Sequence, residues 1–420
     1  MTTIKDSTIS WVGDIPDSWS VVRNKNCFSC SKEIVGERSG TTQLLSLTKS
    51  GIKKISAEET TGKVPESYDT YQIVVPNDMV MCLFDLDVSA VFSGISPYSG
   101  MISPAYKVLK CNGTILPQYA DYWFSFVFDG RKFKHYSKNL RYTLTYDEFA
   151  RLPIVLPDLE EQTRIVNHLC EKCAQIDTVI EKTRETIEVY KRLKRTVITQ
   201  AVTKGSILVN YLEVPNGWES RKLKTFITIP VVDGPHESPE LFEAGVPYIS
   251  ATAIENGKIN FDLRRGYISE EYSLECNKKY KPRRNDILVV KLGASTGQVA
   301  IVESDDRFNI WVPLAAVRCN EKVNSRFIYY CFQSEYLIRQ MELSWTFGTQ
   351  QTLGVKTIEQ LKFLIPPLEE QLSIVAYLDR KCSDIDALIL EKTKLLAEIE
   401  DYKKTIIYEY VTGKKEVPVC

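Results

Sequence analysis

Two short basic runs are the residues of this 420-residue chain best suited to contact a polyanion. The run RKFKHYSKNLR at 131–141 holds five basic and no acidic residues, interleaved with Phe133, His135 and Tyr136. The run KKYKPRRND at 278–286 holds five basic residues against one acidic residue. Basic side chains supply the salt-sensitive attraction to nucleic-acid phosphates, and aromatic side chains pack on sugars and bases. The runs indicate nucleic-acid contact; the alternative is a pair of solvated basic loops.

Motifs for catalysis are missing from the sequence. Neither GxxxxGK[ST] nor GxGxxG occurs, and the glycines at 293 and 297 in KLGASTGQVA have the wrong spacing to receive a pyrophosphate. The chain has only three histidines, which makes a His-based catalytic or metal cluster a poor hypothesis. A net charge of −1 and a pI near 6.4 do not by themselves predict a nucleic-acid binder, so that hypothesis rests on local charge.

The chain repeats itself, and the repeat defines the elements that must position the basic runs. LPDLEEQTRIVNHL at 156–169 returns as IPPLEEQLSIVAYL at 365–378, so that Gln371 follows Gln162 by 209 positions. A second echo opens each half: IPDSW at 15–19 returns as VPNGW at 214–218, 199 positions later. The chain is therefore a tandem duplication, in which each copy combines a variable region with a shared segment.

The shared segments predict two long helices. Each begins at proline followed by Glu-Glu, which suits the positive end of a helix. The seam of each helix needs a partner, and the other copy is favoured because the chain tethers it at high effective concentration. The basic KRLKR at 191–195 is interpreted as a solvated face near a helix C-terminus. Residues at alternating steps of three and four form the a/d seam of a heptad repeat: Val166, Leu169, Cys173, Ile176, Ile180, Thr183, Ile187, Tyr190, Lys194, Val197 and Ala201, then Val375, Leu378, Cys382, Ile385, Ile389, Lys392, Leu396, Ile399, Lys403, Ile406 and Tyr410.

The cysteines are interpreted as structural thiols. Eleven cysteines without a secretory leader favour a reduced, cytoplasmic protein. CxxC occurs at Cys27/Cys30 and at Cys170/Cys173, which could suggest zinc. In the second copy Cys173 recurs as the seam residue Cys382, whereas Cys170 becomes Asp379, so this pair is interpreted as helix residues.

The variable regions predict two mixed α and β domains. Short apolar runs such as YQIVV at 71–75 and DILVVKL at 286–292, broken by Pro, Gly, Asn and Asp, are typical of strands. IYYCFQSEYLIRQM at 328–341 is a predicted helix, and QYADYWFSFVF at 118–128 is its counterpart. The predicted segments are a domain at 1–156, a helix at 157–205, a second domain at 206–365 and a second helix at 366–415.

These motifs resemble the specificity subunit of type I restriction-modification systems over essentially the whole chain. The strongest elements are WVGDIPDSW, the run LRYTLTYDEFARLPIVLPDLEEQ at 140–162 and its match LGVKTIEQLKFLIPPLEEQ at 353–371. Two departures stand out. YLEVPNGW lacks a tryptophan that would match Trp11, and Asp158 replaces the second proline found at 367.

The resemblance implies an α+β chain with a pseudo-two-fold repeat. Each variable region would be a target recognition domain for one half of a bipartite, asymmetric double-stranded DNA site. The helices would pair as an antiparallel coiled coil that spaces the domains and docks two modification (methyltransferase) subunits. Those partners would bind S-adenosylmethionine and methylate adenine, and restriction (translocase/endonuclease) subunits would use ATP and magnesium. The chain itself would hold no cofactor or metal and would not be an enzyme alone.

Candidate site residues follow from the basic runs and from the resemblance, which points to the loop before each closing helix. Arginine suits guanine and glutamine suits adenine. The DNA-binding candidates are Arg131, Lys132, Lys134, Lys138, Asn139, Arg141, Tyr142, Lys278, Lys279, Arg283, Arg284, Thr349, Gln350 and Gln351. The candidates for partner docking or helix pairing are Leu159, Glu160, Glu161, Gln162, Leu169, Ile176, Ile180, Leu368, Glu369, Glu370, Gln371, Leu378, Ile385 and Ile389.

Two other functions fit part of the sequence. A helix-paired scaffold without a DNA role would explain the seam, but it would not explain two globular domains with basic, aromatic runs. A DNA-binding regulator that acts alone would explain the runs. Stoichiometric co-purification of a methyltransferase distinguishes these two from the specificity subunit.

Overall fold

The computed structural model describes residues 3–48, 51–56, 66–86, 92–129, 132, 142–205, 207–208, 211–212, 214–347 and 351–418. The chain forms two compact units: unit 1 is Met1–Arg184 with Lys394–Cys420, and unit 2 is Glu185–Thr393. Each of the two long helices begins in one unit and ends in the other, so the units cut across the helical segments that the sequence predicts. Among the described residues, no helix is long and apolar enough to cross a membrane.

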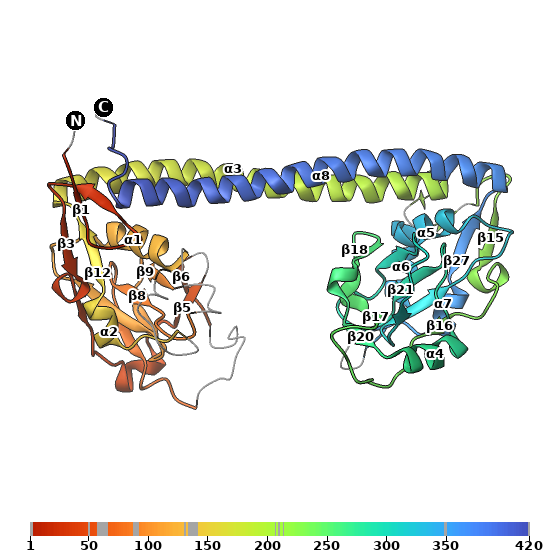
Figure 1. The fold of residues 1–420 in the computed structure, drawn as a ribbon, viewed down its shortest axis with the longest axis horizontal. Helices are drawn as coiled ribbons and strands as arrows, with labels where there is room; N and C mark the ends of the chain where they lie inside the picture. The colour runs from red at the N-terminus through yellow and green to blue at the C-terminus, as the bar shows by residue number, and fades with distance from the viewer. Residues whose placement is uncertain are drawn as a thin grey trace. The chain divides into compact units, whose positions relative to one another are not determined.

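Unit 1 contains a four-stranded antiparallel sheet in the order β4-β11-β8-β9, with α1 packed against it (Figure 1). The core joins this sheet and α1 to the long helices through Trp123, Phe149 and Ile176. The elements are β1 (Ile4–Asp6), β2 (Asp14–Pro16), β3 (Ser20–Arg23), β4 (Phe28–Cys30), β5 (Leu45–Thr48), β6 (Gly51–Lys54), β7 (Gln72–Val74), β8 (Met79–Met81), β9 (Ser93–Ile95), β10 (Gly100–Ile102), β11 (Lys107–Cys111), α1 (Pro117–Asp129), α2 (Tyr146–Arg151), β12 (Pro153–Leu156) and the start of α3 (Leu159–Thr203).

Unit 2 contains a four-stranded sheet in the order β16-β24-β21-β22 and a three-stranded sheet in which β17 pairs in parallel with β23. Its elements are β13 (Ile207–Leu208), β14 (Tyr211–Leu212), β15 (Glu219–Lys222), β16 (Val232–Asp233), β17 (Val246–Ile249), β18 (Ile254–Glu255), β19 (Lys258–Ile259), β20 (Gly266–Ile268), α4 (Glu270–Lys279), β21 (Ile287–Val290), β22 (Val299–Ile301), β23 (Asn309–Ile310), β24 (Leu314–Val317), α5 (Ser325–Gln333), α6 (Glu335–Leu343), β25 (Thr346–Phe347), β26 (Gln351–Thr352), α7 (Val355–Gln360), β27 (Lys362–Ile365) and the start of α8 (Leu368–Val411).

The helix predicted at 328–341 is two helices, α5 and α6. The break lies at Ser334, whose hydroxyl accepts a hydrogen bond from the Leu337 backbone N–H and so caps α6. A serine side chain that satisfies a helix N-terminus favours a new start over continuation. The periodicity of the apolar residues continues through the break, which is why the sequence predicted a single helix.

The two repeated motifs of each half lie next to each other. In unit 1, β3 follows the IPDSW motif and pairs antiparallel with β12, which leads into LEEQ. In unit 2, β15 follows VPNGW and pairs in the same way with β27. The tryptophans of both motifs are buried, and the indole N–H of Trp218 donates to Glu370 Oε2 at 3.1 Å. Both echoes therefore recur because they build one junction between the variable region and the long helix of each half.

Within each unit the two long helices run side by side and antiparallel (Figure 1). In unit 1 the seam residues Cys173, Ile176 and Ile180 are buried in one core with Ile406 and Tyr410. Residue 177 of α3 bonds to residue 403 of α8, whereas residue 194 bonds to residue 386. Increasing positions on one helix therefore meet decreasing positions on the other, which is the antiparallel pairing that the heptads predict.

One lysine–aspartate ion pair lies at the seam of each unit, and the two ion pairs are equivalent in the repeat. Lys403 Nζ lies 2.6 Å from Asp177 Oδ1 in unit 1, and Lys194 Nζ lies 2.7 Å from Asp386 Oδ2 in unit 2. Asp386 is the repeat of Asp177, and Lys403 is the repeat of Lys194, each 209 positions later. The lysines take an a position of the seam, so their charge would be costly there without the aspartates. The duplication has preserved the interaction together with its register.

The glutamine of each LEEQ motif links a long helix to the variable region of its half through hydrogen bonds. Gln371 is 1% exposed; its Oε1 accepts from the Asn324 N–H at 2.8 Å, and its Nε2 donates to the Pro366 carbonyl at 2.9 Å. Gln162 is 0% exposed and makes the same bonds with the Leu116 N–H at 2.8 Å and the Pro157 carbonyl at 2.9 Å. Such burial means that these glutamines present no surface to a partner subunit.

Replacing Gln371 with leucine should destabilise unit 2. The substitution leaves a buried N–H and a buried carbonyl without partners, at a cost of about 1–3 kcal/mol each. We expect an unfolding free energy lower by about 2–6 kcal/mol, measured by urea denaturation followed by circular dichroism. Gln200→Leu, at an exposed position of α3, is the matched control and should change little. Equal midpoints for Gln371→Leu and Gln200→Leu would contradict this role.

Candidate functional site

The basic run of unit 2 is less positive than the sequence indicates, because acidic residues from other segments pair with it. Lys278 pairs with Glu275 within α4, and Lys279 Nζ lies 2.8 Å from Asp233 Oδ1. Arg284 lies 3.0 Å from Asp305 Oδ2. Three of the four unit 2 candidates with a cationic side chain are thus engaged by carboxylates, a pairing that the count of basic residues within 278–286 could not reveal.

Asp233 is the centre of the strongest of these pairings. Its Oδ2 also lies 2.8 Å from the buried Lys291 Nζ. Burial opposes ionisation of this carboxyl, but hydrogen bonds from Lys279 and Lys291 prevail and hold the pKa of Asp233 at about 2. The carboxylate therefore stays charged at neutral pH and keeps Lys279 directed toward β16.

Hydrogen bonds to the buried carboxylate of Asp286 hold the turn that carries Arg283. Arg318 donates to both carboxylate oxygens of Asp286, at 2.8 and 2.7 Å, and Tyr280 donates at 2.6 Å. The Arg283 backbone N–H donates to the same carboxylate at 2.9 Å. The guanidinium of Arg283 is exposed and makes no ion pair within the described part of the chain. Arg283 is therefore the candidate cation of this run that is both held in place and available.

The loop before α7 contacts the KLGASTG turn. Gln351 lies in β26, and its carbonyl accepts from the Gly293 N–H at 3.1 Å and from Thr296 Oγ1 at 3.3 Å. Gly293 has φ +97°, a conformation that L side chains rarely adopt, so glycine is required at this turn. Thr349 and Gln350 lie outside the described residues. The turn that lacked phosphate-loop spacing instead supports the predicted recognition loop.

Most candidates in unit 1 lie outside the described residues. These are Arg131, Lys134, Lys138, Asn139 and Arg141. Lys132 is described and lines a cavity with Trp11 and Phe126. Tyr142 is half-buried against the unit 1 core and has φ 47°. The described pair thus places one cation at a cavity and one aromatic ring at the edge of a core.

Two arginines of unit 2 that lie outside the basic runs stack on aromatic rings. Arg265 lies over the Trp311 ring, 3.3 Å from its centroid, and Arg264 lies over the Tyr267 ring at 4.4 Å. The Trp311 indole N–H donates to the Glu237 carbonyl at 3.1 Å, which fixes the stack against the 234–240 loop. The signal in the sequence is the dipeptide RR beside an aromatic residue in LRRGY, which is too short to stand out as a charged run.

The docking candidates on the long helices divide into buried and exposed residues. Leu169, Ile176, Ile180, Leu378 and Ile385 are buried, and Ile389 is half-buried. Leu159, Glu160, Leu368 and Glu369 are exposed at the helix starts. Glu161 pairs with Arg164, and Glu370 pairs with Lys204 at 3.2 Å. The buried members pack inside their own units, so the exposed members carry the docking hypothesis.

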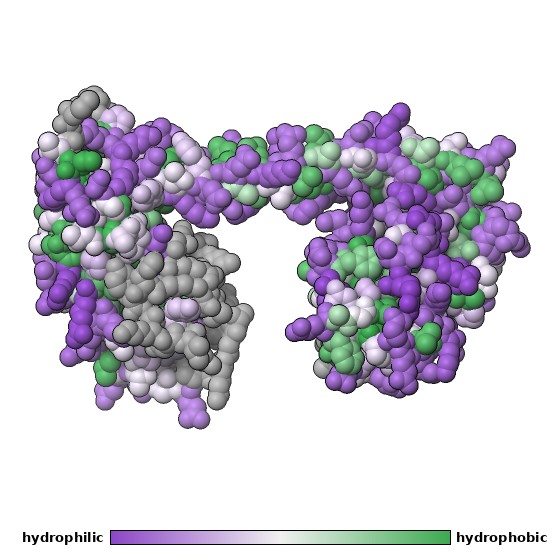
Figure 2. All heavy atoms as spheres, in the orientation of Figure 1, coloured by the Kyte–Doolittle hydropathy of each residue, from purple (hydrophilic) through white to green (hydrophobic). Residues whose placement is uncertain are grey.

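A second set of exposed apolar residues lies on one flank of the helices, at heptad position g. We call Val179, Leu193, Leu388 and Tyr402 the g flank; they are 48%, 45%, 38% and 57% exposed. The register of the two lysine–aspartate pairs sets Val179 beside Tyr402 in unit 1 and Leu193 beside Leu388 in unit 2. Leu388 repeats Val179 and Tyr402 repeats Leu193, each 209 positions later. Figure 2 shows hydrophobic side chains at the surface of these helices. Each unit therefore exposes an apolar pair at equivalent positions of the repeat.

The KRLKR segment lies within α3, as predicted, but the helix dipole does not explain its charges. α3 continues to Thr203 and has no basic residue in its last turn. Helix-dipole effects are confined to the last turn, so they do not account for basic residues at 191–195. Lys191, Lys194 and Arg195 instead line a cavity of unit 2.

Comparison with known proteins bears on the origin of this arrangement. The sequence model for the type I restriction modification DNA specificity domain matches residues 215–401. A Methanocaldococcus jannaschii protein assigned as the specificity subunit of the type I restriction enzyme MjaX is 25% identical over 97% of this chain and 96% of its own length. The Escherichia coli type I restriction enzyme EcoBI specificity subunit is 26% identical over 62% of this chain and 57% of its own length.

The chain is thus similar to type I restriction enzyme specificity subunits, in residues 215–401 by the family model and over nearly its whole length by the MjaX relative.

The fold of this chain also has a solved counterpart. A chain solved in a study of complex assembly and conformational transition of the type I R-M system superposes with a TM-score of 0.67. The likeness covers 96% of this chain and 99% of that chain at 18% identity, so it bears on the fold alone. The fold predicted from the sequence, two mixed domains with two long paired helices, is confirmed.

Proposed function

We propose that this chain is a specificity subunit that directs a type I restriction-modification complex to a bipartite, asymmetric DNA site. Each recognition region reads one half-site, and the paired helices space the half-sites and dock two modification subunits. The partners, not this chain, bind S-adenosylmethionine and methylate adenine, and restriction subunits add ATP- and magnesium-dependent cleavage. The repeated g flank is the observation that carries the proposal, because it gives each unit the same exposed apolar surface beside a recognition region of different sequence.

Equal docking surfaces suit two copies of one partner. Exposed apolar pairs on a helix are suitable for burial against another helix. The recognition regions differ in sequence, in keeping with an asymmetric site, whereas the helices repeat, in keeping with a symmetric pair of partners. A scaffold without DNA binding leaves the exposed Arg283 without a role.

The purified chain alone should transfer no methyl group. Mixed with its modification subunit, S-adenosylmethionine carrying a labelled methyl group and DNA that bears the site, it should give labelled adenine. The modification subunit without this chain should leave the same DNA unlabelled, because nothing would direct it to the site. Labelled DNA from the chain alone, or equal labelling with and without the chain, would contradict the proposed function.

Arg283→Ala should weaken DNA binding of the assembled complex at all sequences alike. Loss of one phosphate contact lowers the slope of log affinity against log salt by about 0.9. Lys279→Ala is the matched comparison and should have the smaller effect, because Lys279 must first leave Asp233 to reach a phosphate. Fluorescence anisotropy over a salt series measures both slopes. A larger change for Lys279→Ala than for Arg283→Ala would show that the Asp233 pair opens on DNA.

A further inference from the structure

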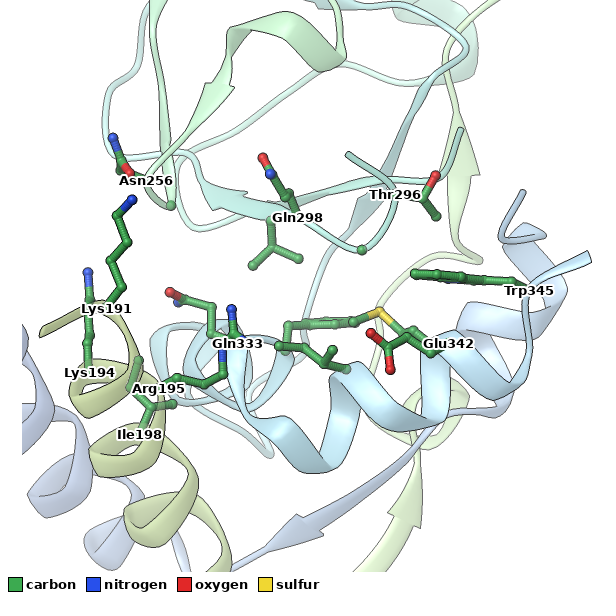
Figure 3. Close-up of a pocket in the computed structure, with 16 residues that line it drawn as sticks. Lys191, Lys194, Arg195, Ile198, Asn256, Thr296, Gln298, Gln333, Glu342 and Trp345 are labelled. Atoms are coloured by element: carbon green, nitrogen blue, oxygen red, sulfur yellow. The ribbon is translucent and has the colours of Figure 1, made fainter. Parts of the chain in front are cut away.

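A cavity of about 480 Å³ in unit 2 lies between α3 and the recognition region (Figure 3). Lys191, Lys194 and Arg195 reach it from α3. The opposite wall is mixed: the apolar and aromatic side chains of Phe332, Ile338, Met341, Trp345 and Val299 lie among the polar Asn256, Thr296, Gln298 and Gln333 and the acidic Glu342. Lys194 is engaged by Asp386 at 2.7 Å and Lys191 by Glu188 at 2.8 Å, while Arg195 is exposed. We call this cavity the α3 pocket; it combines a basic rim with a floor in which apolar and aromatic side chains lie among polar ones.

Unit 1 has a cavity of about 370 Å³ with the same character. Lys404, Ile407 and Tyr408 reach it from α8, and Ser125 and Phe126 reach it from α1. Lys132 adds a second cation, and Trp11 adds a second large aromatic ring. We call it the α8 pocket.

The two pockets occupy equivalent places in the repeat. Lys404 repeats Arg195 and Ile407 repeats Ile198, each 209 positions later. The buried glutamines align α1 with α5, because Gln162 binds the Leu116 N–H and Gln371 binds the Asn324 N–H. By that alignment Ser125 repeats Gln333, and both line their pockets. The recognition regions differ in sequence, so a pocket kept in both halves is tied to the repeated part of the structure.

The chemistry of both pockets favours a peptide over DNA. The apolar and aromatic part of each floor suits one bulky apolar side chain, and a basic rim suits a neighbouring carboxylate. Duplex DNA exposes its phosphates and sugars, whereas its apolar base faces remain stacked inside the helix. It would therefore leave the apolar part of the floor unfilled. Lys191 and Ile198 take heptad position e, so the α3 pocket opens on the flank that is not the g flank.

We propose that each pocket binds an acidic segment of a modification subunit, anchored by one bulky apolar side chain. This inference rests on the proposed function, since it needs a partner present in two copies. Each modification subunit would then contact the helix pair at two places. One contact is the g flank, and the other is the pocket on the flank of heptad position e. Carboxylates of such a segment would be attracted to the basic rim, and this attraction weakens as the salt concentration rises.

Charge reversal at the rims tests the proposal with full-length chain and purified modification subunit. Arg195→Glu should lower the affinity for one of two modification subunits at least tenfold, and Arg195→Glu with Lys404→Glu should lower both, measured by calorimetric titration. Arg192→Glu, an equal charge change at an exposed position outside the pocket, is the control and should bind like the wild type. Wild-type stoichiometry of two with unchanged affinity in the double variant would overturn the pocket proposal and leave the proposed function standing. A wild-type chain that binds no modification subunit would overturn the proposed function itself.

Photo-crosslinking identifies the occupant independently of charge. Benzoylphenylalanine placed at Gln333 or at Ser125 should crosslink, in the complex with DNA, to an acidic segment of the modification subunit that mass spectrometry can locate. The same probe at Arg192 should give no such crosslink. Crosslinks to DNA from both pocket positions would assign the pockets to nucleic acid, and crosslinks to neither would show that no partner enters; either result overturns the proposal.

Discussion

Glutamate at both Leu193 and Leu388 should cost the complex one of its two modification subunits and with it nearly all methylation. The two side chains form the apolar pair of the g flank in unit 2 and are 45% and 38% exposed. Burial of a carboxylate at an apolar interface is unfavourable unless it is paired. Hot-spot side chains contribute about 2 kcal/mol or more each, so two changes should weaken this docking by several hundredfold.

The matching pair in unit 1 makes the experiment symmetric. Val179→Glu with Tyr402→Glu should remove the other modification subunit, and all four changes together should remove both. Ala174→Glu with Ser383→Glu, at exposed positions on a different flank, is the control and should retain two subunits. Glutamate is a good helix former and these sites are on the surface, so stability of the isolated chain should change little. Mass photometry measures how many modification subunits are bound. If the variant with all four changes still binds two subunits, the g flank is excluded as a docking surface.

Lengthening the helix pair by one heptad should change the unread spacer of the DNA site. Seven residues inserted after Glu181 in α3 and seven after Glu398 in α8 face each other in the register set by the two lysine–aspartate pairs. The heptad phase is kept, and the pair grows by about 10 Å at ~1.5 Å per residue. DNA advances ~3.4 Å per base pair, so we expect one to three additional base pairs with both half-site sequences unchanged.

The insertion must be made in both helices. An insertion in α3 alone would leave seven residues without a partner on α8 and would set one of the two lysine–aspartate pairs out of register. That single insertion is therefore the control and should reduce activity without giving a new spacer. Methylation mapping of the paired variant decides between outcomes. An unchanged spacer in an active complex would mean that the helices dock partners without setting the distance.

The seam was predictable from sequence because it depends on local periodicity. Cys173, Ile176 and Ile180 follow the heptad spacing, and all three are buried with residues from the other copy of the repeat. The duplication also located the junction between each variable region and its helix. It did not show which contacts form that junction. The role of Gln371 depends on a hydrogen bond to Asn324, 47 positions away, which no local pattern records.

The charges of the candidate DNA-binding residues were not predictable in the same way. Lys279 is basic in sequence, but its partner Asp233 lies 46 positions earlier on β16. KRLKR was interpreted as a solvated face near a helix C-terminus, because the sequence did not show that Lys191, Lys194 and Arg195 line a cavity of unit 2. A count of charges in a window reports local composition, whereas the field at a surface depends on which strands the fold brings together.

Methylation mapping of DNA from cells that express this chain with its modification subunit tests the central claim most directly. The account predicts one bipartite, asymmetric adenine-methylation motif that is absent when this chain is omitted. Exchange of residues 206–365 for the recognition region of another specificity subunit should change one half of that motif and leave the other half unchanged. A motif that persists without this chain, or an exchange that alters both halves, would contradict the account.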